Sequence, residues 1–263
     1  MQLSLHTHQI QTGSGSICLY AKSGVLSSHA PRPVLLLIHG VFRHSSELFQ
    51  WADCDDSGFD LVFADLPGHG QSSATEDVTI AGFAAAVADA ITTALGGRDV
   101  VVVGSSLGGL VALALGCLGI ESVKAVVAAD PPLTMAKLWH VRREIGRVLA
   151  GIQLNQFMIS YTGNIFGVSP DGSVSERIYY QLIENSKVPV LVLTGDVPLF
   201  PERDVNAVPC MIDDVDRYVI ERLSGNKALV QTVSGCGHML LTEDLDKCHR
   251  TVERFAAIHT AKS

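Results

Sequence analysis

The chain has 263 residues, of which 47% are hydrophobic and 17% charged, and its formal net charge is −8. This composition excludes a disordered chain, and the length suits one large domain or a core with one insertion. The negative charge, without any basic run, argues against a nucleic-acid-binding surface.

The sequence predicts no targeting segment and no membrane span. The first residues lack a basic start followed by an apolar core, and no apolar run reaches the ~18 residues that a span needs. The six cysteines show no C-x-x-C spacing, which favours reduced thiols in the cytoplasm. We therefore expect a cytoplasmic protein that uses neither a metal nor a cofactor, while association into a homo-oligomer stays open.

Strand-like and helix-like runs alternate along the chain. Residues 3–10 and 16–21 are expected to form an opening hairpin. The runs that follow are typical of βα units, which predict an α/β fold with a mostly parallel central sheet and helices on both faces. The expected strands are 34–38, 60–64, 99–103, 124–129, 188–194 and 228–233, and the clearest helices are 80–95 and 244–258.

The most informative segment joins one of these strands to a helix. Residues 100–103 are four consecutive valines, typical of a strand buried on both faces. Residues 104–108, Gly-Ser-Ser-Leu-Gly, fit G-x-S-x-G, the turn that presents a nucleophile at the start of a helix. Ser106 is thus the predicted nucleophile, and the N–H of Leu107 a predicted oxyanion donor. A dinucleotide-binding loop would need glycine in place of Ser106.

Residues 133–186 interrupt the alternation of strands and helices. We predict that they form a small helical cap between the sixth and seventh strands, with 1–132 and 187–263 forming the core. Residues 131–187 include six Lys/Arg and four Asp/Glu residues. This positive excess indicates either a solvated helix face or a weak attraction for anionic substrates. The first part of the segment, residues 133–152, is expected to form an amphipathic helix, because apolar residues recur there at helical spacing: Leu138, Val141, Ile145, Val148 and Ile152.

A nucleophilic serine needs a base within hydrogen-bond reach and an acid that orients the base. His238 follows the last strand in the glycine-rich loop 234–238, which matches the chain order Ser, acid, His of this architecture. His39 stands at a strand end and is interpreted as a structural or oxyanion-loop residue. The N–H of Val41, two residues later, is the second predicted oxyanion donor.

Together these motifs resemble the α/β-hydrolase superfamily, in the group with a cap between the sixth and seventh strands. The resemblance implies a serine hydrolase that cleaves an ester, thioester or related acyl bond of a small to medium substrate through an acyl-enzyme. It implies a Ser-His-Asp triad with Ser106 as nucleophile and His238 as base, and an oxyanion hole from Val41 and Leu107. The segments that carry it are 39–40, 65–72 (Asp-Leu-Pro-Gly-His-Gly-Gln-Ser), 104–108, 195–196 and 237–238.

The acid of the triad departs from the family pattern. After the seventh strand the family usually has Gly-x-x-Asp, and Pro198 occupies the place of that aspartate. The nearest carboxylate is Asp196, and we expect it to be the acid through a shifted loop. Asp130 is the alternative, because some family members take their acid from the end of the sixth strand. Asp204 and a dyad without an acid are the remaining alternatives.

Two other function classes stay open. Some proteins of this fold have lost catalysis and act as ligand-binding or scaffold proteins. A cofactor-free C–C hydrolase, lyase or oxygenase on the same scaffold would use similar residues. The expected partner is a small-molecule acyl substrate.

Overall fold

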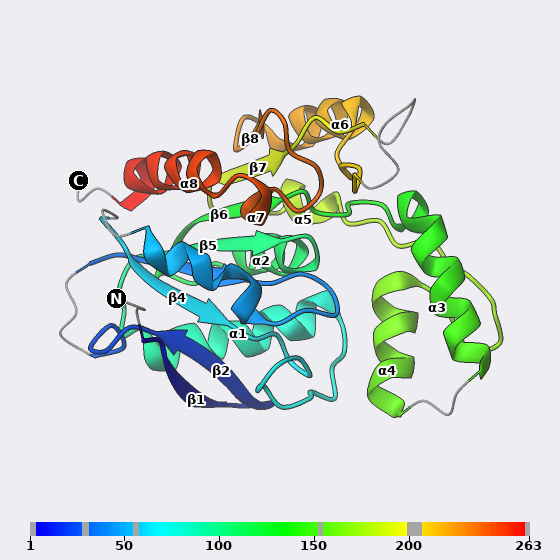
Figure 1. The fold of residues 1–263 in the computed structure, drawn as a ribbon, viewed down its shortest axis with the longest axis horizontal. Helices are drawn as coiled ribbons and strands as arrows, with labels where there is room; N and C mark the ends of the chain where they lie inside the picture. The colour runs from blue at the N-terminus through cyan, green and yellow to red at the C-terminus, as the bar shows by residue number, and fades with distance from the viewer. Residues whose placement is uncertain (1–3, 28–31, 55–57, 152–154, 199–206, 261–263) are drawn as a thin grey trace.

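The computed structural model describes residues 4–27, 32–54, 58–151, 155–198 and 207–260. These residues form an eight-stranded sheet in the order β1-β2-β4-β3-β5-β6-β7-β8 (Figure 1). β1 (His6–Thr12) and β2 (Gly15–Ala21) form the predicted hairpin, and β2 is also antiparallel to β4. All the other neighbouring strands are parallel: β3 (Val34–Ile38), β4 (Asp60–Ala64), β5 (Val100–Ser105), β6 (Val123–Ala129), β7 (Val190–Thr194) and β8 (Ala228–Thr232).

Helices cover both faces of the sheet, so the predicted α/β fold is confirmed (Figure 1). Successive strand residues point to opposite faces. Leu36 and Val102 accordingly pack in one apolar core, while Leu37 and Val103 pack in the other. The first core includes side chains of α1 (Ile80–Ala94), α2 (Leu107–Leu118) and α6 (Asp214–Ser224), and the second includes those of η1 (Ser45–Asp53), α7 (Leu240–Glu243) and α8 (Leu245–Thr260).

The segment between β6 and β7 is mainly helical. It contains η2 (Met135–Leu138), α3 (Trp139–Gly151), α4 (Gln156–Tyr161), η3 (Thr162–Phe166) and α5 (Gln181–Glu184). α3 and α4 lie beyond the carboxyl ends of the strands, and α5 packs against α2 (Figure 1). The single helix expected over 133–152 is instead a 3-10 turn followed by α3, and residues 152–154 lie outside the described residues.

Every helix of the described ranges is too short or too polar to cross a membrane.

Candidate active site

Ser106 occupies the turn between β5 and α2 with φ of +52° and ψ of −112°. This backbone conformation is strained for a residue with a Cβ, and such strain is concentrated at functional sites. The glycines on either side make the turn sterically feasible. A Cβ on Gly104 would lie 1.9 Å from the carbonyl oxygen of Gly108, and one on Gly108 would lie 2.5 Å from that of His39. The G-x-S-x-G pattern therefore reflects close backbone packing around the serine.

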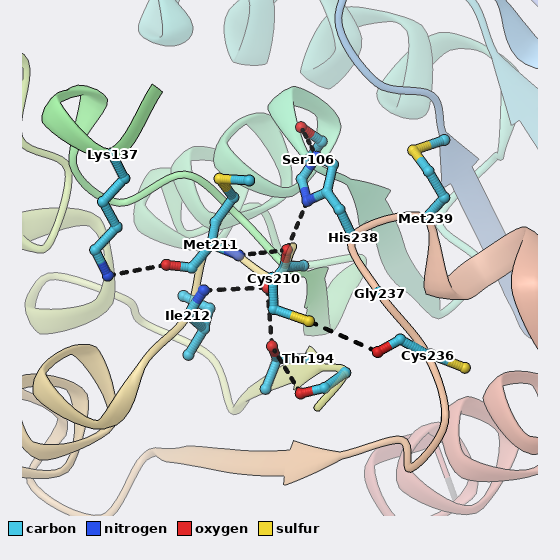
Figure 2. Close-up of polar contacts among 12 residues, drawn as sticks. Ser106, Lys137, Thr194, Cys210, Met211, Ile212, Cys236, Gly237, His238 and Met239 are labelled. Carbon is cyan, nitrogen blue, oxygen red and sulfur yellow. Dashed lines mark hydrogen bonds and ion pairs between the residues drawn. The ribbon is translucent and has the colours of Figure 1, made fainter. Parts of the chain in front are cut away.

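His238 lies against Ser106, as the sequence predicts. Its Nε2 is 3.0 Å from Ser106 Oγ (Figure 2). The backbone around the histidine is held on both sides. The N–H of His238 donates to Val208 O at 3.0 Å, and the Glu243 carboxylate accepts from the N–H groups of Gly237 and Met239. These bonds fix the loop that directs the imidazole towards the serine.

The carboxylate next to His238 belongs to Asp130. His238 Nδ1 lies 2.5 Å from Asp130 Oδ2, and Asp130 is fully buried directly after β6. Three further donors reach the same carboxylate: Thr194 Oγ1 at 2.9 Å, the N–H of Met211 at 2.8 Å and the N–H of Ile212 at 3.2 Å. These four contacts give both oxygens of the buried carboxylate hydrogen-bond partners and fix its orientation.

The expectation that Asp196 lies against His238 is wrong. Asp196 Oδ2 accepts from Ser234 Oγ at 2.7 Å, and its Oδ1 accepts from the N–H of Gly235 at 2.8 Å. These two hydrogen bonds lower the pKa of Asp196. The physical reason is that the backbone after β7 pairs with this turn, since the N–H groups of Asp196 and Val197 donate to Cys236 O. Asp196 thus holds the loop before His238. Asp204 lies outside the described residues.

His39 is buried and structural. Its Nε2 accepts from the N–H of Leu66 at 3.0 Å, which leaves Nδ1 to donate to Gly40 O at 2.8 Å. Desolvation lowers the pKa of His39 to about 4, so the ring is neutral at pH 7. This agrees with the interpretation of His39 as a structural residue of the oxyanion loop.

Both predicted oxyanion donors lie near Ser106. Leu107 is next to it in the chain, and Val41 is brought close to it by the fold. Leu107 is the first residue of α2, where a backbone N–H has no partner within the helix. Val41 follows Gly40, whose Cβ, if present, would lie 3.6 Å from Ser106 Cβ. Within the part of the chain that the structure describes, neither N–H has an acceptor. Both are therefore free to bind an oxyanion.

Phe42, which the sequence reasoning missed, extends the site towards the helices between β6 and β7. Its φ is +54°, and the residue is 53% exposed, although its ring lies 5.6 Å from the ring of Tyr161 and stacks at 6.2 Å on that of Phe166. A positive φ in a bulky residue is rare, so only the tertiary structure reveals this position.

An apolar cavity of about 340 Å³ opens beside Phe42. Neither Ser106 nor His238 lines this cavity or a larger one, of about 540 Å³, whose lining includes Gly195 and Cys210. We relate the smaller cavity to the site because Phe42 directly follows Val41. Its lining comes mainly from α3 and α4: Phe42, Val141, Glu144, Ile145, Leu149, Met158 and Thr162.

Among the described residues, no group of three or more His, Cys, Asp or Glu side chains is arranged to hold a metal ion.

Residues 35–252 match the model of the alpha/beta hydrolase family. The match covers most of the chain, which therefore belongs to the alpha/beta hydrolase family. This membership confirms the resemblance predicted from the motifs. No curated protein matches the chain in sequence.

Solved structures share the fold over nearly the whole chain. An N-acyl homoserine lactonase, AidH, crystallised as a single-residue mutant in complex with N-hexanoyl homoserine, is 17% identical, with a TM-score of 0.67 and 99% of both chains covered. Carboxylesterase CesB from Bacillus subtilis is 17% identical, with a TM-score of 0.66, 97% of this chain and 92% of that chain covered. E-2-(Acetamidomethylene)succinate hydrolase is 18% identical, with a TM-score of 0.68, 96% of this chain and 99% of that chain covered.

Proposed function

We propose that this protein is a serine hydrolase of esters, thioesters or related acyl compounds, with Ser106, His238 and Asp130 as its catalytic triad. One observation carries the proposal: a continuous chain of hydrogen bonds runs from Ser106 Oγ through both imidazole nitrogens to Asp130 Oδ2. Family membership supports the reaction class, and several similar structures are named as hydrolases of acyl compounds.

In the acylation step, Ser106 Oγ attacks the substrate carbonyl carbon while His238 Nε2 takes the hydroxyl proton. The carbonyl oxygen becomes negative and accepts hydrogen bonds from the N–H groups of Val41 and Leu107. When the tetrahedral intermediate collapses, His238 gives its proton to the leaving alcohol or thiol. Water then attacks the acyl-enzyme with His238 again as the base, which releases the acid and restores Ser106.

Asp130 supports both steps without taking a proton. Its carboxylate accepts from His238 Nδ1–H, which fixes the tautomer that leaves Nε2 free to face Ser106. It also stabilises the imidazolium that forms during each proton transfer. The donors from Thr194, Met211 and Ile212 hold this carboxylate in its orientation.

The apolar cavity beside Phe42 favours a substrate with a hydrocarbon group. Its two polar lining residues have partners elsewhere: the Glu144 carboxylate binds Arg147 and Arg143, and the Thr162 hydroxyl donates to backbone carbonyls of its own helical segment. A cavity without unpaired polar groups gains free energy from an apolar occupant. We infer that the hydrocarbon part of the substrate lies there when its carbonyl oxygen faces Val41. The helical segment 133–186 would then act as the cap.

Labelling with a fluorophosphonate tests this function directly, because the reagent requires an activated serine rather than a binding pocket. We expect wild-type protein to be labelled and to hydrolyse p-nitrophenyl acetate, and Ser106→Ala to do neither. A folded wild-type protein that is neither labelled nor active would instead indicate a ligand-binding protein of this fold.

A further inference from the structure

A lysine between β6 and β7 reaches the acid loop, residues 210–212, whose backbone holds Asp130. Lys137 lies in η2, and its side chain is only 16% exposed. Its ammonium group contacts the carboxylate of Asp216, lies 2.8 Å from Asp213 Oδ2 and donates to Met211 O at 2.9 Å. One cation from the segment between β6 and β7 thus contacts both the acid loop and the first turn of α6.

The buried carboxylate of Asp216 stabilises the position of the Lys137 ammonium group. The side chain of Asp216 is 1% exposed, and a buried carboxylate needs charged and hydrogen-bonding partners. Besides Lys137, it accepts from the hydroxyl of Tyr180 and from the N–H of Asp213 at 2.8 Å. Lys137 and Tyr180 both belong to the segment between β6 and β7, at opposite ends of it. The buried carboxylate therefore joins this segment to the start of α6.

The same network ends at the acid of the triad. Lys137 binds the carbonyl oxygen of Met211 (Figure 2). The N–H groups of Met211 and Ile212 donate to Asp130. Each residue has only two soft backbone dihedrals, so fixing the carbonyl at Met211 also limits how its own N–H and the next one move. The ammonium group thus restrains two of the four donors that surround the Asp130 carboxylate.

We propose that Lys137 is a positioning residue that orients Asp130 towards His238 by holding the backbone at Met211. The effect of Lys137 on turnover rests on the proposed function. The effect of Lys137 on the hydrogen bond between Asp130 and His238 is independent of that function. If the acid loop shifts by even about 1 Å, the imidazole loses its alignment with Ser106, and such displacements cost about 100-fold in rate.

The test uses a pair of substitutions that leaves no unpaired buried charge. Lys137→Gln with Asp216→Asn neutralises both partners, and the Asn oxygen still accepts from the N–H of Asp213. The matched control is Arg142→Gln with Glu176→Gln, which removes another ion pair of the same segment. Arg142 is 7% exposed and binds Glu176 and Ser175 O, not the acid loop. Circular dichroism and thermal melting report folding.

Two readouts are measured on each variant. The first is the low-field proton NMR resonance of the His238 Nδ1–H bonded to Asp130, which requires no turnover. We expect it to shift or disappear in the Lys137/Asp216 variant and to stay in the control. The second is hydrolysis of p-nitrophenyl acetate, where we expect kcat to fall between about 10-fold and 100-fold and KM to change less than about twofold.

Epistasis separates positioning from a general structural effect. In an Asp130→Asn background, the Lys137/Asp216 substitutions should cause no further loss of kcat, because they act through the missing carboxylate. Losses that multiply, an unchanged NMR resonance, or an equal loss in the control would each overturn the proposal. If wild-type protein shows the resonance but hydrolyses no ester, the proposed function fails and the NMR comparison alone decides the role of Lys137.

A second variant keeps the test decisive if the first does not fold. Lys137→Met with Asp216→Leu replaces the ion pair by apolar side chains of similar size, an exchange that is often neutral or stabilising. The same two readouts apply to it. If neither variant folds, the pair serves stability, and the positioning role is rejected.

Discussion

Asp130 and Asp196 follow neighbouring strands, but their carboxylates have different partners. Asp130 binds the imidazole of His238, whereas Asp196 binds the turn at Ser234 and Gly235. Asp130→Asn should therefore lower kcat on the order of 10³-fold, because an amide cannot stabilise the imidazolium and favours the wrong tautomer. Asp196→Asn should cost less than about tenfold, since its amide oxygen still accepts one of the two bonds. Steady-state kinetics with p-nitrophenyl acetate checks the ranking, and the reverse order would assign the acid to Asp196.

Ser106 and His238 should behave as one unit. Either residue replaced by alanine should lower kcat by about 10³-fold or more, and the double variant should be hardly worse than either single variant. The reason is that the proton transfer needs both groups at 3.0 Å. A double-mutant cycle measures the coupling. Multiplicative losses would mean that the two side chains act separately.

The local pattern of the sequence predicts that Ser106 and His238 meet, because each position depends on nearby chain features: a strand, a glycine-rich turn and the chain order. Which carboxylate contacts His238 depends on residues that are distant in sequence. Asp130 has φ of +46° and receives two backbone donors from residues 81 and 82 positions later. No short sequence motif indicates this contact, whereas the family pattern Gly-x-x-Asp after the seventh strand favoured Asp196. Lys137 could not be predicted either, because its contact with Met211 joins residues 74 positions apart.

At the scale of elements, the strands are the most predictable part of the molecule. The expected strands from 34–38 onwards agree with β3 to β8 within two residues at each end. Runs of Val, Leu and Ile that are buried on both faces suit only a central strand. The helices between β6 and β7 are less predictable because contacts distant in sequence decide where they begin and end. Thr134, for example, forms an isolated bridge with Ile178, 44 positions away, where the sequence suggested a helix.

The cavity between α3, α4 and Phe42 predicts a dependence on substrate chain length. In a series of p-nitrophenyl esters, kcat/KM should rise by about fourfold for each added CH₂, the equivalent of about 0.8 kcal/mol, until the cavity is full. Met158→Trp should end this rise at a shorter chain, because the indole occupies part of the cavity that Met158 lines.

Ile178→Trp is the matched control for the chain-length series. Ile178 is 54% exposed in the same segment and does not line the cavity, so its replacement should leave the ratio of octanoate to acetate kcat/KM unchanged. A wild-type series that is flat from acetate to octanoate contradicts the cavity assignment. Hydrolysis of the short ester would remain as evidence for the proposed reaction.

At the scale of the whole molecule, the site lies where the loops that follow several strands of one half of the sheet, β5 to β8, meet. Ser106 follows β5, Asp130 follows β6, and His238 follows β8, so their side chains meet at the carboxyl ends of the parallel strands. The acid loop between β7 and α6 adds backbone donors at this edge, and Lys137 connects it to the helices beyond the edge. The position of the segment between β6 and β7 and the geometry of the triad are therefore linked through a few hydrogen bonds.

The buried His39 should make global stability depend on pH. Its pKa is about 4 in the folded protein because of desolvation, against an ordinary value of 6.5. The unfolded chain therefore binds the proton more tightly than the folded chain, and stability falls as pH drops from about 6.5 towards 4. Between pH 7 and pH 5 this one histidine should remove about 2 kcal/mol from the free energy of unfolding.

His39→Gln should reduce that pH dependence while it keeps an acceptor for the N–H of Leu66, although its stability at pH 7 will be lower because the ring also packs against His69 at 5.3 Å. Urea unfolding at pH 7 and pH 5 measures the difference for each variant. The exposed His140 on α3, replaced by Gln, is the control and should leave the wild-type difference unchanged. Because His69 also has a lowered pKa through burial, some acid sensitivity should persist in His39→Gln. If His39→Gln loses as much free energy of unfolding between pH 7 and pH 5 as the wild type, protonation of His39 does not cause the acid destabilisation.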